Sequence, residues 1–63
     1  MSFLFEFCRQ ELSDNDYIKV KDNYSNKYIF SGTVAELLTN LNLHGFCVLQ
    51  YEAHADYIEI LVV

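Results

Sequence analysis

The clearest periodic pattern lies in the middle of the chain. Thr33 and Glu36 have the T-x-x-E spacing of a capping box, in which both side chains bind free amide groups at the start of a helix. Apolar residues then fall at i, i+3, i+4 and i+7, namely Val34, Leu37, Leu38 and Leu41. Three residues that follow tolerate the left-handed backbone of a C-cap: Asn40, Asn42 and Gly45. We predict a helix of two to three turns that packs on another element.

Alternating apolar positions near the C-terminus predict a β-hairpin with strands 46–52 and 57–63 around a four-residue turn. This register places three apolar pairs on one face: Cys47/Val62, Leu49/Ile60 and Tyr51/Ile58. We expect that face to pack under the helix. The other face is polar at Gln50/Glu59 and Glu52/Tyr57, and apolar at Phe46, Val48, Leu61 and Val63. A lone subunit would leave those four apolar side chains in water unless the N-terminal element covers them, so we expect them to form a self-association surface.

A second hairpin is predicted upstream, with strands 17–21 and 27–30 around the turn-forming residues 23–26. Its register is open. Pairing Asp22 with Lys27 brings opposite charges together and sets Val20 against Ile29, and this register is the one we favour. A shift of one residue sets Ile18 against Phe30 and Val20 against Tyr28, but it also places Lys21 opposite Lys27.

Residues 3–12 fit two patterns equally well. Phe3, Phe5 and Phe7 alternate as in a strand, whereas Phe3, Leu4, Phe7, Cys8 and Leu12 form a helical stripe. Ser13 to Asp16 end either element. The expected fold is therefore α+β: a small antiparallel sheet of two β-hairpins with one short capped helix between them, and a strand or a helix at the N-terminus.

The 63 residues predict one domain, and composition restricts its class. Hydrophobic residues make up 52%, with five Phe and five Tyr, so disorder is not expected. Such a small body cannot bury them all, which favours a homodimer or an obligate protein partner. No apolar run is long enough to cross a membrane, and Glu6 interrupts the N-terminal apolar stretch, unlike in a signal peptide. We therefore expect a cytoplasmic protein that does not bind membranes.

Charge is distributed unevenly along the chain. All four basic residues lie in the first 27 positions beside five acids, whereas residues 28–63 contain four acids and no Lys or Arg. Direct nucleic-acid binding requires clustered cations, so it is not expected. The C-terminal acids predict a partner-binding acidic surface near the tip of the last hairpin, made of Glu36, Glu52, Asp56, Glu59 and the neighbouring Tyr57. Its plainer interpretation is a solvated face that keeps the protein soluble.

Candidate chemistry is sparse. His44, Cys47, His54 and Cys8 are ligand types for zinc, but the predicted hairpin places the two histidines at opposite ends of a strand roughly 20 Å long. The cysteines are better explained as reduced thiols buried as small hydrophobes. The acids near the last turn are solvated, and there is no glycine-rich phosphate loop. We expect no metal, no cofactor and no enzymatic activity.

Tyrosines and lysines of the first hairpin are a second, weaker candidate surface. Tyr17, Tyr24 and Tyr28 lie on or near it, together with Lys19 and Lys21. Tyrosine is common at interface hot spots, although exposed strand tyrosines are more often simply good β-formers.

The run from Tyr28 to Leu38, YIFSGTVAELL, together with small size and acidity, resembles many small proteins of bacteriophages and mobile elements. The resemblance covers about one strand and one helix and carries no functional residues with it. It implies a host-directed inhibitor or regulator. The function expected is thus a non-enzymatic acidic protein that occupies the basic surface of a host nucleic-acid-handling protein. The alternative is a structural homodimeric module or an accessory subunit of a larger assembly.

Overall fold

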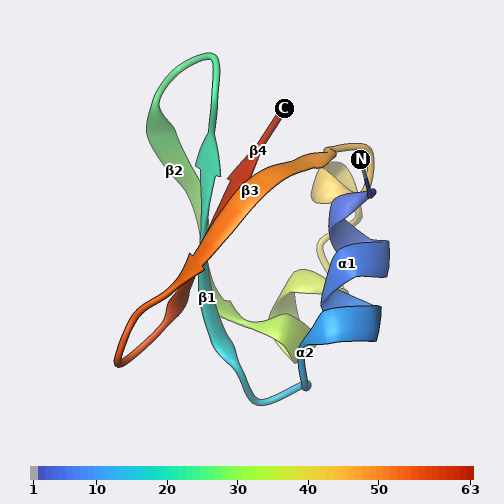
Figure 1. Cartoon of the computed structure of the whole chain (residues 1–63). Helices are drawn as coiled ribbons and strands as arrows, with labels where there is room; N and C mark the ends of the chain where they lie inside the picture. Colours follow the sequence, from blue (N-terminus) through green and yellow to red (C-terminus); the bar gives the residue numbers. More distant parts are fainter. Residues whose placement is uncertain (1) are drawn as a thin grey trace.

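A computed structural model describes residues 2–63 (Figure 1). In chain order its elements are α1 (Leu4–Glu11), β1 (Tyr17–Asp22), β2 (Lys27–Thr33), α2 (Val34–Leu37), the 3-10 helix η1 (Leu41–Leu43), β3 (Val48–Ala53) and β4 (Ile58–Val62). The predicted α+β fold is confirmed, with two hairpins on either side of a short capped helix. The N-terminal element, for which helix and strand were both open, is a helix.

The four strands form one sheet in the order β2-β1-β4-β3. Each hairpin is antiparallel, but β1 and β4 pair in parallel at the centre. The sheet is therefore mixed, and the prediction of a purely antiparallel sheet was wrong. Parallel pairing of the central strands sends the two hairpin turns to opposite ends of the sheet (Figure 1).

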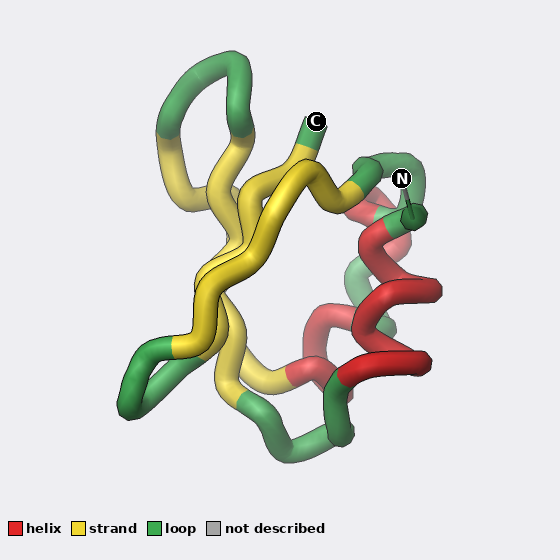
Figure 2. Tube along the Cα trace, in the orientation of Figure 1, coloured by secondary structure: helices red, strands yellow, loops and turns green. Residues whose placement is uncertain are grey.

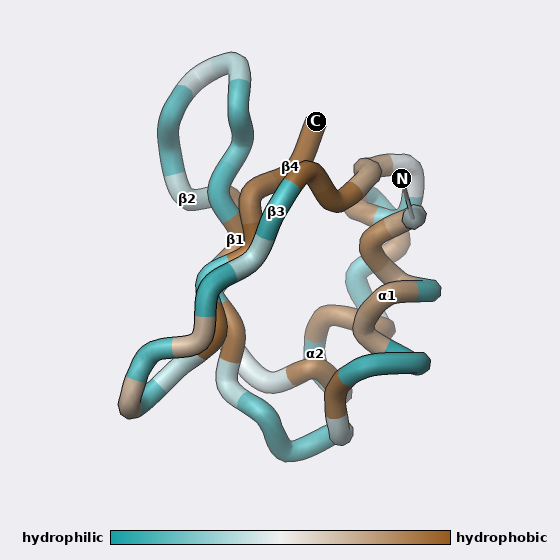
Figure 3. Tube along the Cα trace, in the orientation of Figure 1, coloured by the Kyte–Doolittle hydropathy of each residue, from teal (hydrophilic) through white to brown (hydrophobic). Residues whose placement is uncertain are grey.

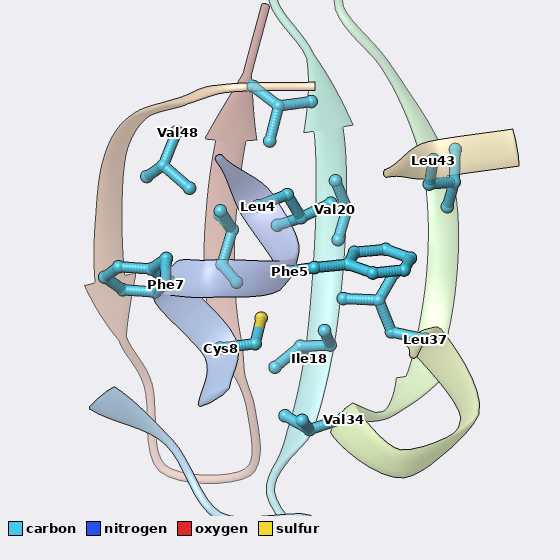
Figure 4. Packing of buried hydrophobic residues seen from close by; sticks show 12 residues of the cluster. Leu4, Phe5, Phe7, Cys8, Ile18, Val20, Val34, Leu37, Leu43 and Val48 are labelled. Carbon is cyan, nitrogen blue, oxygen red and sulfur yellow. The ribbon is translucent and has the colours of Figure 1, made fainter. Parts of the chain in front are cut away.

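All the helices lie on one side of the sheet (Figure 2). The side chains between the two layers form the core (Figure 4): Leu4, Phe5, Phe7, Cys8, Ile18, Val20, Val34, Leu37, Leu43, Val48, Ile60 and Val62. Hydrophobic positions accordingly concentrate in α1 and in the central strands, whereas the β1–β2 turn is hydrophilic (Figure 3). Burial of Leu4, Phe5, Phe7 and Cys8 against the sheet explains why residues 4–11 are helical, since a strand would turn alternate residues away from the core.

The capping box at the start of α2 is confirmed, but the helix is shorter than predicted. Thr33 and Glu36 exchange both capping hydrogen bonds. The hydroxyl of Thr39 then donates to the Glu36 carbonyl at 2.8 Å, and the backbone leaves the helical region at Asn40, where ψ is 85°. Leu41 is consequently 72% exposed, and Leu43 from η1 takes the core position at 8% exposure.

The predicted left-handed C-cap after α2 is absent. Across residues 2–63, Asn26 is the one non-glycine residue with positive φ, at 61°, and neither glycine has positive φ. Asn26 lies in the β1–β2 turn, where asparagine tolerates this conformation.

The first hairpin keeps the favoured register only beside its turn, and the alternative register, with Lys21 opposite Lys27, does not occur. Asp22 pairs with Lys27 as favoured, but a β-bulge follows and Val20 pairs with Phe30 instead of Ile29. The extra residue in β2 allows Ile29 and Phe30 both to pack against the core.

The C-terminal hairpin is shifted by two residues from the predicted register. Tyr51 lies opposite Ile60, and Ala53 lies opposite Ile58. Because a shift of two keeps side chains on the same face, Ile60 and Val62 face the core as predicted. A bulge at Leu49 then turns Val48 into the core and leaves Leu49 42% exposed.

This bulge divides the residues predicted as one self-association surface. Val48 is buried, and its N–H donates to the carbonyl of Ser2 at 2.8 Å. Phe46 packs against the core, and its carbonyl accepts from the N–H of Leu4 at 2.8 Å. Leu61 and Val63 are half-buried. The placement of these four residues on one exposed apolar face was therefore wrong, because the protein's own N-terminal segment covers half of it.

Candidate interaction surface

The side of the sheet opposite the helices is open, and we call it the outer face. Alternation along each strand places a residue there when its neighbours point into the core. The outer face includes Tyr17, Lys19 and Lys21 from β1, Tyr28 and Ser31 from β2, Gln50 and Glu52 from β3, Glu59 and Leu61 from β4, and Tyr57 just before β4. Polar and aromatic side chains dominate this surface.

Tyr28 and Glu59 link two strands that are not neighbours in the sheet. The Tyr28 hydroxyl donates to Glu59 Oε1 at 2.7 Å, and β1 lies between β2 and β4. The Glu59 carboxylate raises the pKa of the Tyr28 phenol, because it accepts the phenolic proton and repels the phenolate. Lys21 Nζ lies 5.5 Å from the centre of the Tyr28 ring, which is a cation–π distance.

A second chain of contacts runs along the hairpin end of the same face. Lys19 Nζ lies 4.4 Å from the centre of the Tyr57 ring. The Tyr57 ring stacks on the His54 ring at 4.5 Å, and His54 Nε2 lies 3.1 Å from Glu52 Oε1. These contacts hold two aromatic rings and two charged groups in one row at the surface.

Strand pairing explains why these groups meet. Glu52 and Glu59 lie directly opposite each other in β3 and β4, where like charges destabilise a sheet. Each carboxylate has its own partner, His54 for Glu52 and Tyr28 for Glu59. The parallel pairing of β1 with β4 also places Lys19 beside Glu59, which offsets the repulsion further.

The predicted acidic surface is only partly assembled. Glu52, Glu59 and Tyr57 lie together on the outer face, and Asp56 lies in the adjoining turn beside a hollow of about 300 Å³ that Tyr57 also lines. Glu36 is engaged elsewhere, since its carboxylate accepts from the Thr33 N–H at 2.9 Å in the capping box. This bond, with that from the Thr33 hydroxyl, lowers the pKa of Glu36.

The outer face also contains groups that the acidic-surface prediction omitted. Lys19, Lys21 and Tyr28 come from the first hairpin, which the sequence pattern treated as a separate candidate surface. No local pattern shows that β1 lies beside β4, so the two candidate surfaces could not be recognised as one. The sequence pattern places His54 only in the loop of the last hairpin, although its spacing of two from Glu52 is typical of residues on one face of a strand.

Groups suited to catalysis or metal binding do not converge. Between residues 2 and 63, no three His, Cys, Asp or Glu side chains are placed to hold a metal ion. His44 Nδ1 lies 3.1 Å from the carbonyl of Leu41, away from His54 in the β3–β4 turn. Cys8 is buried, and this burial raises the pKa of its thiol to about 11, which disfavours the nucleophilic thiolate.

Comparison of the chain with models of protein families, with curated proteins and with solved structures finds no match. None of the helices described between residues 2 and 63 has the length and apolar character needed to cross a bilayer.

Proposed function

We propose that this chain is a non-enzymatic binding protein that contacts a protein partner through the outer face of its sheet. The observation that carries the proposal is the pre-organised Lys21–Tyr28–Glu59 group, which joins three strands on an uncovered surface. Such a surface loses little side-chain entropy on binding, because its long side chains are already held by one another.

The aromatic residues support this choice of surface. Tyrosine offers a large contact area and a polar group, and it is enriched among the residues that contribute most to protein–protein binding. Tyr17 and Tyr28 are exposed, and Tyr57 is half-buried between Lys19 and His54. Three tyrosines on one open sheet face therefore favour a protein interface.

Charge supports a basic partner. The net charge is −5, so the long-range field attracts a positively charged surface and speeds its association. A nucleic-acid-handling protein, the partner class expected from the sequence, has such a surface. Lys19 and Lys21 lie on the same face and would repel a purely basic groove. We therefore expect the partner's surface to contain carboxylates as well as basic groups.

A capture experiment with three baits tests the proposal. Immobilised wild-type protein, a Tyr28→Ala/Tyr57→Ala double variant and a Tyr24→Ala variant are incubated with cell lysate, and bound proteins are quantified by mass spectrometry. Tyr24 is the matched control, because it is an exposed tyrosine in the β1–β2 turn and lies off the outer face.

We expect the wild-type and Tyr24→Ala baits to capture the same basic protein, and the Tyr28→Ala/Tyr57→Ala bait not to capture it. Its association rate should fall as salt concentration rises. Equal capture by all three folded baits would place the binding site elsewhere, and capture of no protein by any bait would contradict the proposal.

A further inference from the structure

Strand β3 forms one edge of the sheet, and most of that edge is unpaired. Among residues 2–63, the contact that covers this edge is at its first residue, where the Val48 N–H donates to the Ser2 carbonyl. Leu49, Gln50, Tyr51, Glu52 and Ala53 follow, and all five are exposed. No lysine or proline interrupts this segment, although proteins commonly use these residues to block a free edge.

The backbone groups at this edge point outward at alternate residues. His54 donates its N–H to the Tyr57 carbonyl at 2.8 Å, so these two residues form a hydrogen-bonded pair. In an antiparallel ladder such pairs alternate with pairs whose N–H and C=O point away from the partner strand. The backbone groups of Ala53 and Tyr51 therefore point away from β4, towards the position of a fifth strand.

Side chains beside this edge form a hollow next to an exposed aromatic ring. Tyr51 is 56% exposed, and its ring centre lies 4.8 Å from that of Phe7 in α1. A hollow of about 330 Å³ adjoins it, lined by Ser2, Phe7, Val48, Leu49, Gln50 and Tyr51. A strand added here would place a side chain of its own next to this hollow.

We propose that a second copy of this chain pairs with the β3 edge, antiparallel and about a two-fold axis at Tyr51. Two-fold symmetry then sets Tyr51 against Tyr51 of the second copy, and each tyrosine lies beside the other copy's hollow. Directly opposite residues on one face are about 5 Å apart, which brings the two rings into contact. A contact of this kind is isologous, so it closes at a dimer.

The chemistry of the edge fits this register. Gln50 lies opposite Glu52 of the second copy, and Ala53 lies opposite the bulge at Leu49 of the second copy. Glu52 is thus matched with an amide and not with another carboxylate. The pairing ends at Val48, whose N–H is already bound to Ser2.

Two properties of the dimer follow. The contact involves five residues of one strand and the adjoining side chains, so its buried area is small compared with the ≈1,200–2,000 Å² of stable interfaces. We therefore expect a weak dimer, with a dissociation constant of about 1 μM or higher. Each copy has a net charge of −5, so salt should strengthen the dimer by screening their repulsion. The dimer contact uses the β3 edge, shares Gln50 and Glu52 with the outer face, and would place two outer faces side by side.

Charge substitutions at Gln50 test the register. Gln50→Lys introduces two attractive pairs with Glu52 across the axis, and Gln50→Glu introduces two repulsive pairs. Sedimentation velocity over a range of concentrations should show the dissociation constant falling by roughly two- to ten-fold in the first variant and rising by a similar factor in the second.

Matched variants separate this effect from net charge. Gln10→Lys and Gln10→Glu change the charge equally at an exposed site on α1. They should shift the dissociation constant much less than the Gln50 variants do. In addition, the amides of Tyr51 and Ala53 should exchange hydrogen more slowly in concentrated than in dilute samples.

Three results would overturn the proposal. One is a monomer at millimolar concentration in high salt. Another is a dimer whose dissociation constant responds equally to charge at positions 50 and 10. The third is a dimer that leaves exchange at Tyr51 and Ala53 unchanged, since pairing at the edge requires their backbone groups.

Discussion

The hydroxyl of Tyr28 donates a 2.7 Å hydrogen bond to the carboxylate of Glu59, although 31 positions separate the two residues in the chain. Their strands, β2 and β4, flank β1, so the two side chains meet above the central strand. This contact exists only because the second hairpin places β4, and not β3, beside β1. A measurement that detects this contact therefore tests both the strand order and the arrangement of the outer face.

Replacing Glu59 should restore the ordinary acidity of Tyr28. We expect the pKa of Tyr28, raised by the Glu59 carboxylate, to fall towards 10 in Glu59→Gln and to stay raised in Glu52→Gln. NMR of the tyrosine ring carbons through a pH titration measures this. An unchanged pKa in Glu59→Gln would mean that the contact is absent in solution.

The same contact predicts how stability depends on pH. Because folding raises the pKa of Tyr28, its contribution to the free energy of unfolding is present below the phenol's ordinary pKa and is lost as pH rises through the raised value. The stability difference between wild type and Tyr28→Phe should therefore shrink in alkaline urea titrations. A difference that is constant up to the alkaline limit would contradict this linkage.

Removal of the capping hydroxyl should weaken the link between β2 and α2. Thr33→Ala leaves the Glu36 N–H without its side-chain acceptor, and we expect a loss of about 1 kcal/mol in the free energy of unfolding measured with urea. Thr39→Ala is the control, since its hydroxyl donates to a carbonyl within the same turn and should contribute less. Equal losses in the two variants would argue against a specific cap.

Acid should weaken the cap from the other side. Hydrogen bonds from Thr33 lower the pKa of Glu36 below its ordinary value of 4.5. Because folding lowers this pKa, the Glu36 carboxylate stabilises the fold at pH values above its ordinary pKa. This contribution is lost as the pH falls through the lowered pKa of the folded state. The stability difference between wild type and Glu36→Gln should thus be smaller at pH ~3 than at pH ~7.

Leu41 and Leu43, two positions apart in η1, should differ sharply in their contribution to stability. Leu43→Ala removes a core side chain and should cost about 2–5 kcal/mol, whereas Leu41→Ala should change stability by less than about 0.5 kcal/mol. Thermal and urea unfolding of both variants measure this. If Leu43→Ala does not fold while Leu41→Ala does, Leu43 is again the more important residue. A greater loss of stability in Leu41→Ala would support the longer helix predicted from the sequence.

The two thiols should react in a fixed order. Cys8 is buried with its pKa raised to about 11, whereas Cys47 is half-buried, so a thiol reagent should label Cys47 first and Cys8 only on unfolding. The raised pKa also means that stability should fall as pH rises from about 9, where the unfolded thiol ionises, to about 11. Mass spectrometry of Cys8→Ala and Cys47→Ala after brief labelling distinguishes the sites.

Local chemistry made much of this fold predictable. The Thr33–Glu36 cap depends on residues three apart, and the turn at residues 23–26 depends on the Asp22 carboxylate, which accepts from the Ser25 N–H three positions away. Alternation in the last strand assigned Ile60 and Val62 to the core correctly. Each of these features is decided by neighbours in the chain, which is why pattern alone was sufficient.

Only the tertiary structure decided how these parts combine. Residues 3–12 fit a helix and a strand equally well by pattern, and packing against one face of the sheet favours the helix. Packing also buries Leu43 and not Leu41, and it accommodates the bulges at Ile29 and Leu49. The parallel meeting of β1 and β4, which joins lysines, tyrosines and glutamates into the outer face, is a contact between distant segments. Such contacts depend on the packing of the whole domain, so no local pattern in the chain records them.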